Sequence, residues 1–441
     1  MANTETDADE RLDAAVERDD SAGAAPVSLL GRYARLPRNV IAISLVSLLN
    51  DASSEIIYPL LPFFLSITLG ASPAVIGLIE GAAESVSALL KLFAGYFSDL
   101  RARRKGPVVF GYTLAGAVRP LLAFAVSWYQ VLVLRLTDRV GKGIRSAPRD
   151  AMIADAARPG ERGLAFGFHR AMDHAGAVIG PLIGYLLIYF IAADRNAPTA
   201  LDYRKVFLVA SVPALAAVLV AAVFVKESYA KRRDSSVVSE PPRLSLLGFD
   251  ANFLRFLALV ALFTLSNSSD AFLLLRAHEA GVRTATIPLL WAALHLSKVL
   301  SSLVGGDLSD RLGRKALIAS GWLLYAGVYA VFAYVSTPLG AWAIFLVYGL
   351  YFGLAEGAEK ALVADLVLPE QRGTAYGLYN LAFSITVFPA SLLMGLLWSW
   401  RGAHTAFLTS ALIGASAALL LILTVSAHRS PGDDEEPALA A

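Results

Sequence analysis

The stretch GYFSDLRARRK at residues 95–105 has a counterpart, GDLSDRLGRK at residues 306–315, which repeats its Gly, Ser and Asp and one Arg at the same spacing. A second pair follows in the same order, with ADAARPGERGLAFG at 154–167 and ADLVLPEQRGTAYG at 364–377. In each pair the copies stand about 210 residues apart, within an otherwise apolar chain. Charged turns repeated in this way are typical of a membrane protein built from two similar helical halves.

The composition agrees with a membrane protein. Of the 441 residues, 56% are hydrophobic and 17% are charged, and the mean hydropathy is +0.58. Water does not accept so much apolar surface, whereas a bilayer does. The chain has no cysteine, which excludes disulfides, a thiol nucleophile and a thiolate metal site. We expect no metal, no cofactor and no nucleic-acid partner.

Twelve stretches approach or exceed the roughly 20 residues that a helix needs to cross a bilayer. The first six are 39–69, 74–98, 107–127, 129–157, 161–192 and 204–225. The second six are 252–275, 286–309, 314–336, 339–368, 371–398 and 404–427. The predicted fold class is therefore an all-α membrane protein with two six-helix bundles, residues 39–225 and 252–427.

Three polar segments flank these bundles. Residues 1–38 are rich in Ala, Asp and Glu and lack the apolar core of a signal peptide, so we expect a disordered tail. Residues 226–251 contain KRRDSS and two adjacent prolines, a linker composition. Residues 428–441 form an acidic tail. Because Lys and Arg gather in the linker and in the loops on its side, we expect a multi-pass plasma-membrane protein with both termini cytoplasmic.

The repeated loop resembles a signature of the major facilitator superfamily, Gly-x-x-x-Asp-(Arg/Lys)-x-Gly-(Arg/Lys)-(Arg/Lys). The second copy matches every position, and the first has Leu100 and Ala102 where the family has a basic residue and Gly. The matching residues are Gly306, Asp310, Arg311, Gly313, Arg314 and Lys315, and in the first copy Gly95, Asp99, Arg103 and Arg104. The resemblance implies a secondary transporter of twelve spans, with these residues as a cytoplasmic gate.

Span 5 carries a further pattern. Gly176, Gly180, Pro181 and Gly184 resemble the Gly-x-x-x-Gly-Pro-x-x-Gly motif of proton-coupled antiporters in that superfamily. Small residues with a proline suit a helix that bends between two states, and ordinary close packing explains them equally well. The antiporters also have a motif in span 4 with an Arg at the position of Thr137 in this sequence. Because this chain has Thr there, no proton-relay Arg is assigned.

Span 1 contains two acidic residues, Asp51 and Glu55, at membrane depth. A charge there costs about 2.5–3.5 kcal/mol, so it requires a reason. The two lie four residues apart on one helical face, and a low dielectric disfavours their double ionisation. One of them can therefore carry a proton. Pro59 and Pro62 should break the helix just beyond, leaving backbone groups free to face a cavity.

Span 7 is the symmetry-related helix, and its Asn267-Ser268-Ser269-Asp270 corresponds to Asn50-Asp51-Ala52-Ser53 of span 1. The resemblance places spans 1 and 7 on opposite sides of a central cavity. We therefore predict proton-coupling or cavity roles for Asp51, Glu55, Asn267 and Asp270. Weaker substrate-cavity candidates are Asn50, Tyr58, Arg276, Lys298, Tyr351 and Tyr379. For the tyrosines, ordinary helix packing is the alternative.

Charged residues near the cytoplasmic ends are candidates for gating. Arg149-Asp150 and Glu359-Lys360 occupy repeated positions with opposite charge order, which predicts salt bridges between the halves. In span 5, Arg170 has Asp173 within reach on its own helix.

These observations favour a transporter that exports a small organic molecule in exchange for protons. Proton-coupled uptake is the first alternative, and a receptor or scaffold that transports nothing is the second. An enzyme is disfavoured, because the sequence contains no catalytic constellation. We expect a monomer whose partners are the solute, protons and the bilayer.

Overall fold

The computed structural model describes residues 36–101, 104–157, 162–227, 246–368 and 371–426. For residues 92, 94–101, 162–163, 303–311 and 373 it describes the backbone alone. The two expected tails and most of the expected linker lie outside these ranges. Throughout the described ranges the regular elements are helices.

The first half contains six membrane-length segments, of which the first is one long helix followed by two short pieces. They are α3 (Arg38–Ile57) with α4 (Leu61–Phe63) and the π-helix η1 (Phe64–Thr68), α5 (Pro73–Arg101), α6 (Lys105–Leu122), α7 (Trp128–Ala156), α8 (Arg162–Ile191) and α9 (Ala200–Phe224).

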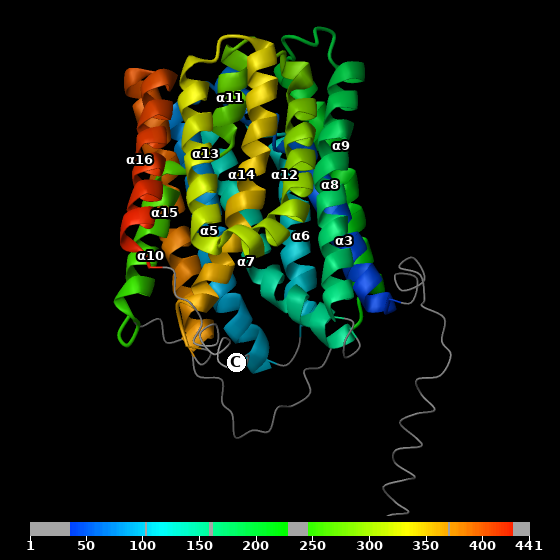
Figure 1. Ribbon diagram of the computed structural model, residues 1–441. Helices are drawn as coiled ribbons and strands as arrows, with labels where there is room; N and C mark the ends of the chain where they lie inside the picture. The colour runs from blue at the N-terminus through cyan, green and yellow to red at the C-terminus, as the bar shows by residue number, and fades with distance from the viewer. Residues whose placement is uncertain (1–35, 102–103, 158–161, 228–245, 369–370, 427–441) are drawn as a thin grey trace, which may run out of the picture.

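The second half repeats this order. Its elements are α10 (Ala251–Ser266) with α11 (Ala271–Glu279), the 3₁₀ turn η2 (Thr284–Thr286), α12 (Ile287–Leu312), α13 (Arg314–Tyr334), α14 (Pro338–Asp365), α15 (Arg372–Arg401) and α16 (Ala403–Thr424). The predicted fold class, with twelve segments in two six-helix halves, is confirmed (Figure 1).

Nine of the described helical stretches are long and apolar enough to cross a membrane. Helix α7 is not one of them, because it carries many charges along its length. Among these are Arg135, Asp138, Arg139, Lys142 and Arg145. Such a helix is stable inside a membrane only when its charged face meets protein or a water-filled cavity.

The first span breaks where the prolines predict it. Helix α3 ends at Ile57 and the chain resumes helical structure at Leu61. Local hydrogen bonds occupy some backbone groups at the break: Tyr58 N–H donates to Ser54 O at 2.9 Å and Leu60 N–H to Ile57 O at 3.0 Å. The expectation that other backbone groups face a cavity stays a prediction.

The seventh span also breaks, which the sequence analysis did not predict. Helix α10 ends at Ser266 and α11 begins at Ala271, so Asn267 to Asp270 form an irregular segment. Short polar side chains explain the break without a proline, since they compete for backbone partners. Ser269 Oγ accepts from Ala271 N–H at 3.3 Å, and Ser391 Oγ on α15 accepts from Ser269 N–H at 3.1 Å.

The halves are packed closely at one end of the bundle. We name the end where α9 finishes and α10 begins the linker end, and the other the far end (Figure 1). At the far end, a Cβ on Gly395 of α15 would lie 2.4 Å from Pro73 O of α5. The ring centroids of Phe63 and His278, one from each half, are 5.2 Å apart. The far end is therefore closed, and the cavities between the halves lie below it.

Candidate functional site: a charged cavity between the halves

Polar side chains from both halves surround a cavity of about 220 Å³, named here the charged cavity. Helix α3 contributes Asn50, Asp51, Ser54 and Glu55, and Tyr58 follows its end. The other lining residues are Glu84, Arg119, Arg135, Asp138, Arg139, Lys142, Arg145, Asp270 and Trp291. The structure thus brings Asp51, Glu55 and Asp270 together, as the sequence analysis predicted, with Asn50 and Tyr58 beside them.

The small residues of α8 determine where the polar stripe of α3 lies. A Cβ on Gly176 would lie 2.7 Å from Leu48 O, and one on Gly180 would lie 2.5 Å from Ala52 O. At Gly184 the corresponding distance to Ile56 O is 3.2 Å. Only glycine permits this approach, so the motif fixes α8 against the carboxylate-bearing turns of α3. A bending role for Pro181, which lies inside α8, stays a prediction.

Gly180→Ala should lower the free energy of unfolding by about 1–3 kcal/mol, as overpacking does. The added methyl group would meet Ala52 O at 2.5 Å and Glu55 Cβ at 2.7 Å, and neither atom can move without moving α3. Thermal unfolding in detergent measures this change. Gly167→Ala is the matched control on the same helix, since its Cβ meets nothing within 4 Å. Equal unfolding midpoints for the two variants would contradict the packing role.

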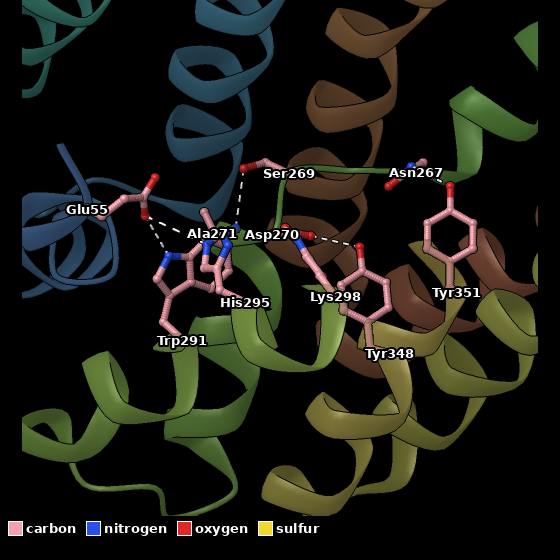
Figure 2. Close-up of polar contacts among 10 residues, drawn as sticks. All are labelled: Glu55, Asn267, Ser269, Asp270, Ala271, Trp291, His295, Lys298, Tyr348 and Tyr351. Atoms are coloured by element: carbon pink, nitrogen blue, oxygen red, sulfur yellow. Dashed lines mark hydrogen bonds and ion pairs between the residues drawn. The ribbon is translucent and has the colours of Figure 1, made fainter. Parts of the chain in front are cut away.

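Glu55 joins the two halves across the charged cavity (Figure 2). Its Oε2 accepts a hydrogen bond from Trp291 Nε1 of α12 at 2.7 Å. His295 Nε2, one turn further along α12, is 3.9 Å from the same oxygen. The Trp291 ring also packs on Tyr58, with centroids 5.0 Å apart. A titratable group of one half therefore holds a helix of the other, just below the closed far end.

Asp270 lies at the end of the irregular segment and is bound within its own half (Figure 2). Its Oδ1 accepts from Tyr348 OH at 2.8 Å, and Lys298 Nζ lies 3.3 Å from Oδ2. Lys298 thus neutralises a carboxylate, and it is not among the residues that line either cavity between the halves. Asn267 donates from Nδ2 to Tyr351 OH at 3.5 Å, a long contact.

The basic and acidic side chains of α6 and α7 are the part of the site that the sequence analysis missed. Arg135 Nη2 lies 2.7 Å from Glu80 Oε2, and Arg139 Nη2 lies 2.8 Å from Glu84 Oε1. A signal was present, because residues 135, 139 and 142 are spaced by four and three and so share one helical face. That face meets α5 and the charged cavity.

A second cavity, of about 490 Å³, lies between the halves toward the linker end, and we name it the aromatic cavity. Its apolar lining includes Phe263, Tyr351, Phe352, Tyr379 and Phe383. Glu84 lines both cavities, so the two adjoin. Tyr351 and Tyr379 are therefore cavity residues as well as packing residues.

The expected salt bridges between repeated sites are not formed. Arg149 binds its neighbour Asp150 at 2.9 Å, and Lys360 binds Glu356 at 3.0 Å. Glu359 accepts instead from Trp322 Nε1 at 2.8 Å and Tyr379 OH at 2.7 Å. In the described ranges no ion pair joins Arg149 or Asp150 to Glu359 or Lys360. These groups are satisfied within their own half.

A different ion pair crosses between the halves. Arg170 Nη2 of α8 lies 3.8 Å from Glu356 Oε1 of α14. Its expected partner on the same helix was Asp173. Asp173 instead has His169 Nε2 at 3.5 Å. The gating role of these residues stays a prediction.

The ends of the repeated loop form matching ion pairs. Arg104 pairs with Asp155 in the first half, and Arg314 pairs with Asp365 in the second. Gly313 has φ +84°, a conformation that favours glycine. Lys315 Nζ donates to Ile422 O at 2.8 Å. The side chains of the other motif residues, Gly95, Asp99, Arg103, Gly306, Asp310 and Arg311, lie outside the described residues.

Arg276 does not line either cavity. Its guanidinium donates to the carbonyl oxygens of Phe332, Ala333 and Val335 at 3.0, 3.2 and 2.8 Å, and it pairs with Glu279. These bonds tie α11 to the end of α13. The expected contact between Arg276 and substrate is corrected accordingly, because every nitrogen of its guanidinium is occupied by a structural partner.

Comparison with known proteins agrees with this architecture. The family model described as Major Facilitator Superfamily matches residues 43–386 and 259–440. An uncharacterised MFS-type transporter of Methanocaldococcus jannaschii is 33% identical over 394 residues, covering 88% of this chain and 95% of the relative. The fosmidomycin resistance protein of Escherichia coli is 26% identical over 400 residues, covering 88% and 93%. A bacterial homologue of the human lysosomal transporter Spinster, solved in an inward-facing and occupied conformation, has a TM-score of 0.72 at 16% identity, covering 91% and 97%.

Proposed function

Because the chain belongs to the Major Facilitator Superfamily, we propose that it moves a small organic solute across the plasma membrane by alternating access, exporting it in exchange for protons. In this proposal the linker end is cytoplasmic, as the basic loops favour. The solute binds between the halves while the far end is closed, and it is released when the far end opens.

The contact between Glu55 and Trp291 carries the proposal. It joins the halves on the far side of the charged cavity, so the far end opens only when this hydrogen bond breaks. A charged carboxylate accepts hydrogen bonds more strongly than a neutral carboxylic acid does. The strength of this contact between the halves therefore depends on whether Glu55 carries a proton. A conformational equilibrium that depends on protonation is what proton coupling requires.

Two further observations favour export. The relative from Escherichia coli that aligns with 88% of this chain is named a resistance protein. In addition, the Gly-Pro pattern of α8, similar to that of antiporters, contacts the turns of α3 that carry Asp51 and Glu55. Neither observation depends on the identity of the solute.

Proton-coupled uptake is the second candidate, and the cations of the charged cavity favour it. Asp51 and Glu55 share that cavity with Arg119, Lys142 and Arg145. Protonation of the two carboxyl groups would leave an excess of positive charge, so a proton and an anion would bind together. Binding of both partners on the same side is the basis of symport.

Everted vesicles distinguish the two directions. In vesicles energised by respiration, addition of an export solute should collapse part of the pH gradient, and vesicles containing Glu55→Gln should not respond. A chemically broad panel supplies the solutes. Acidification of the interior of intact cells on solute addition, without a response in everted vesicles, would replace export with uptake. If no solute of the panel changes the pH gradient in either system, proton-coupled transport of these solutes is refuted.

A further inference from the structure

The charged cavity contains more cations than its carboxylates neutralise by contact. Three cations at or beside it have carboxylate partners: Arg135 with Glu80, Arg139 with Glu84, and Lys298 with Asp270. Three others that line it, Arg119, Lys142 and Arg145, have no carboxylate oxygen within 4.0 Å among the described residues. The unpaired cations all belong to α6 and α7 of the first half.

Arg119 has a hydrogen-bonding group that the protein leaves unused. Its side chain is 3% exposed, and its Nη2 donates to Asn50 Oδ1 at 2.9 Å. Its Nη1 is buried and finds no acceptor in the described part of the chain. A buried guanidinium donor without an acceptor is costly, and the cost is removed when a ligand oxygen accepts the bond.

Arg145 and Lys142 extend the same positive surface. Arg145 is 5% exposed, and its guanidinium lies over the Tyr112 ring at 4.4 Å from the centroid. Its one hydrogen bond to the described residues, from Nη1 to Gly111 O, is long at 3.4 Å. Lys142 stands one turn before Arg145 on α7 and forms no ion pair within the described ranges. Arg145 thus has only weak partners at the cavity, and Lys142 has no ion-pair partner there in the described ranges.

The carboxylates in the cavity do not cancel this charge under all conditions. Asp51, Glu55 and Asp138 also lack a Lys or Arg partner within 4.0 Å in the described ranges, and Asp51 and Glu55 can each take up a proton. Arginine cannot lose its proton in a protein. The permanent charge of the cavity is therefore positive, and the negative charge is the part that varies.

The aromatic cavity provides the apolar part of the same site. Tyr351 and Phe352 lie with ring centroids 4.9 Å apart, and Phe263 lies 5.8 Å from Tyr351. A volume of about 490 Å³ is within the usual range for sites of small organic ligands. Because Glu84 lines both cavities, the aromatic cavity is a neighbour of the charged cavity.

We propose that the transported solute is an amphipathic organic anion. Its acidic group, a carboxylate, phosphonate or phosphate, binds Arg119, Lys142 and Arg145 of the first half. Its apolar part lies in the aromatic cavity against the second half. A solute held by both halves is positioned to couple their movement. The proposal rests on the transport function above and is independent of the direction of transport.

Three probes that each contain a benzyl group and differ in charge test this preference: benzylphosphonate, benzyl alcohol and benzylammonium. Each is titrated into the full-length protein in detergent, and binding is measured by calorimetry. We expect benzylphosphonate to bind most tightly. Arg119→Gln and Lys142→Gln should each weaken it about tenfold or more, the usual effect of losing a hydrogen bond to a charged group. Arg401→Gln, on an exposed residue that stacks on Trp400, is the control and should leave binding unchanged.

Lys142→Gln keeps the test valid if Arg119→Gln folds poorly, because Lys142 has no hydrogen-bond or ion-pair partner to lose among the described residues. Tighter binding of benzylammonium, equal binding of all three probes, or benzylphosphonate binding unchanged in Lys142→Gln would overturn the proposal. Proteoliposome flux separates it from the function above. Benzylphosphonate that binds but is not carried refutes transport and leaves the anion site, whereas preferential flux of benzylammonium refutes the anion site and leaves transport.

Discussion

Glu55→Gln should reduce proton-driven transport about a hundredfold or more, since proton transfer by a placed side chain contributes an effect of that order. Glutamine keeps the size of the side chain and can still accept the hydrogen bond from Trp291 Nε1. It cannot take up a proton, so the step that links protonation to opening of the far end is lost. Flux into proteoliposomes under an imposed pH gradient measures the effect.

The same variant should retain exchange of labelled for unlabelled solute in the absence of a gradient. In the native protein, a lower pH on the side where solute loads should slow loading by an exporter, because proton and solute alternate on the carrier. It should accelerate loading by a symporter. The charged groups around Glu55 that set this response are Asp51 on α3, Arg139 and Lys142 on α7, and His295 and Lys298 on α12.

Two comparison variants define the role of Glu55. Trp291→Phe removes the donor and keeps the carboxyl group, so coupling should be weakened but still depend on pH. Asp194→Asn, in the loop between α8 and α9, alters an exposed carboxylate and should have no effect. If Glu55→Gln and Asp51→Asn both transport with an unchanged pH profile, the proton site lies elsewhere.

The parts of the site that the sequence could predict are those with a local physical signal. Two carboxylates in an apolar span carry a cost that any fold must justify, and this identified Asp51 and Glu55 without a structure. The prolines likewise indicated where the first span breaks. Most of the twelve segments follow from the length of apolar stretches, which must match the thickness of the bilayer.

The parts that it could not predict depend on how helices pack against one another. Whether Arg139 and Lys142 face a loop, a lipid or a cavity is decided by the rotation of α7 against α5 and α6. The sequence analysis assigned no role to either residue. The break before Asp270 has no proline, and the role of Arg276 depends on the carbonyl groups at the end of α13. Each of these is a tertiary effect.

Arg135→Gln, which breaks the buried ion pair with Glu80, should be the most destabilising single substitution considered for the first half. Glu80 is 3% and Arg135 is 7% exposed, and Nη2 of Arg135 contacts both carboxylate oxygens, at 2.9 and 2.7 Å. Arg135→Gln leaves a buried carboxylate without its counter-ion, which typically costs about 3–5 kcal/mol. Thermal unfolding in detergent and the yield of folded protein measure this loss.

A double-mutant cycle separates the loss of the pair from the isolation of one charge. Glu80→Gln with Arg135→Gln should recover much of the stability, because two neutral amides can bond to each other where a lone carboxylate cannot. The exposed pair of Glu356 and Lys360, at 3.0 Å, is the matched control, and Lys360→Gln should cost less than about 1 kcal/mol. If Arg135→Gln proves no more harmful than Lys360→Gln, water reaches Glu80, and the charged cavity extends further toward α5 than its lining residues indicate.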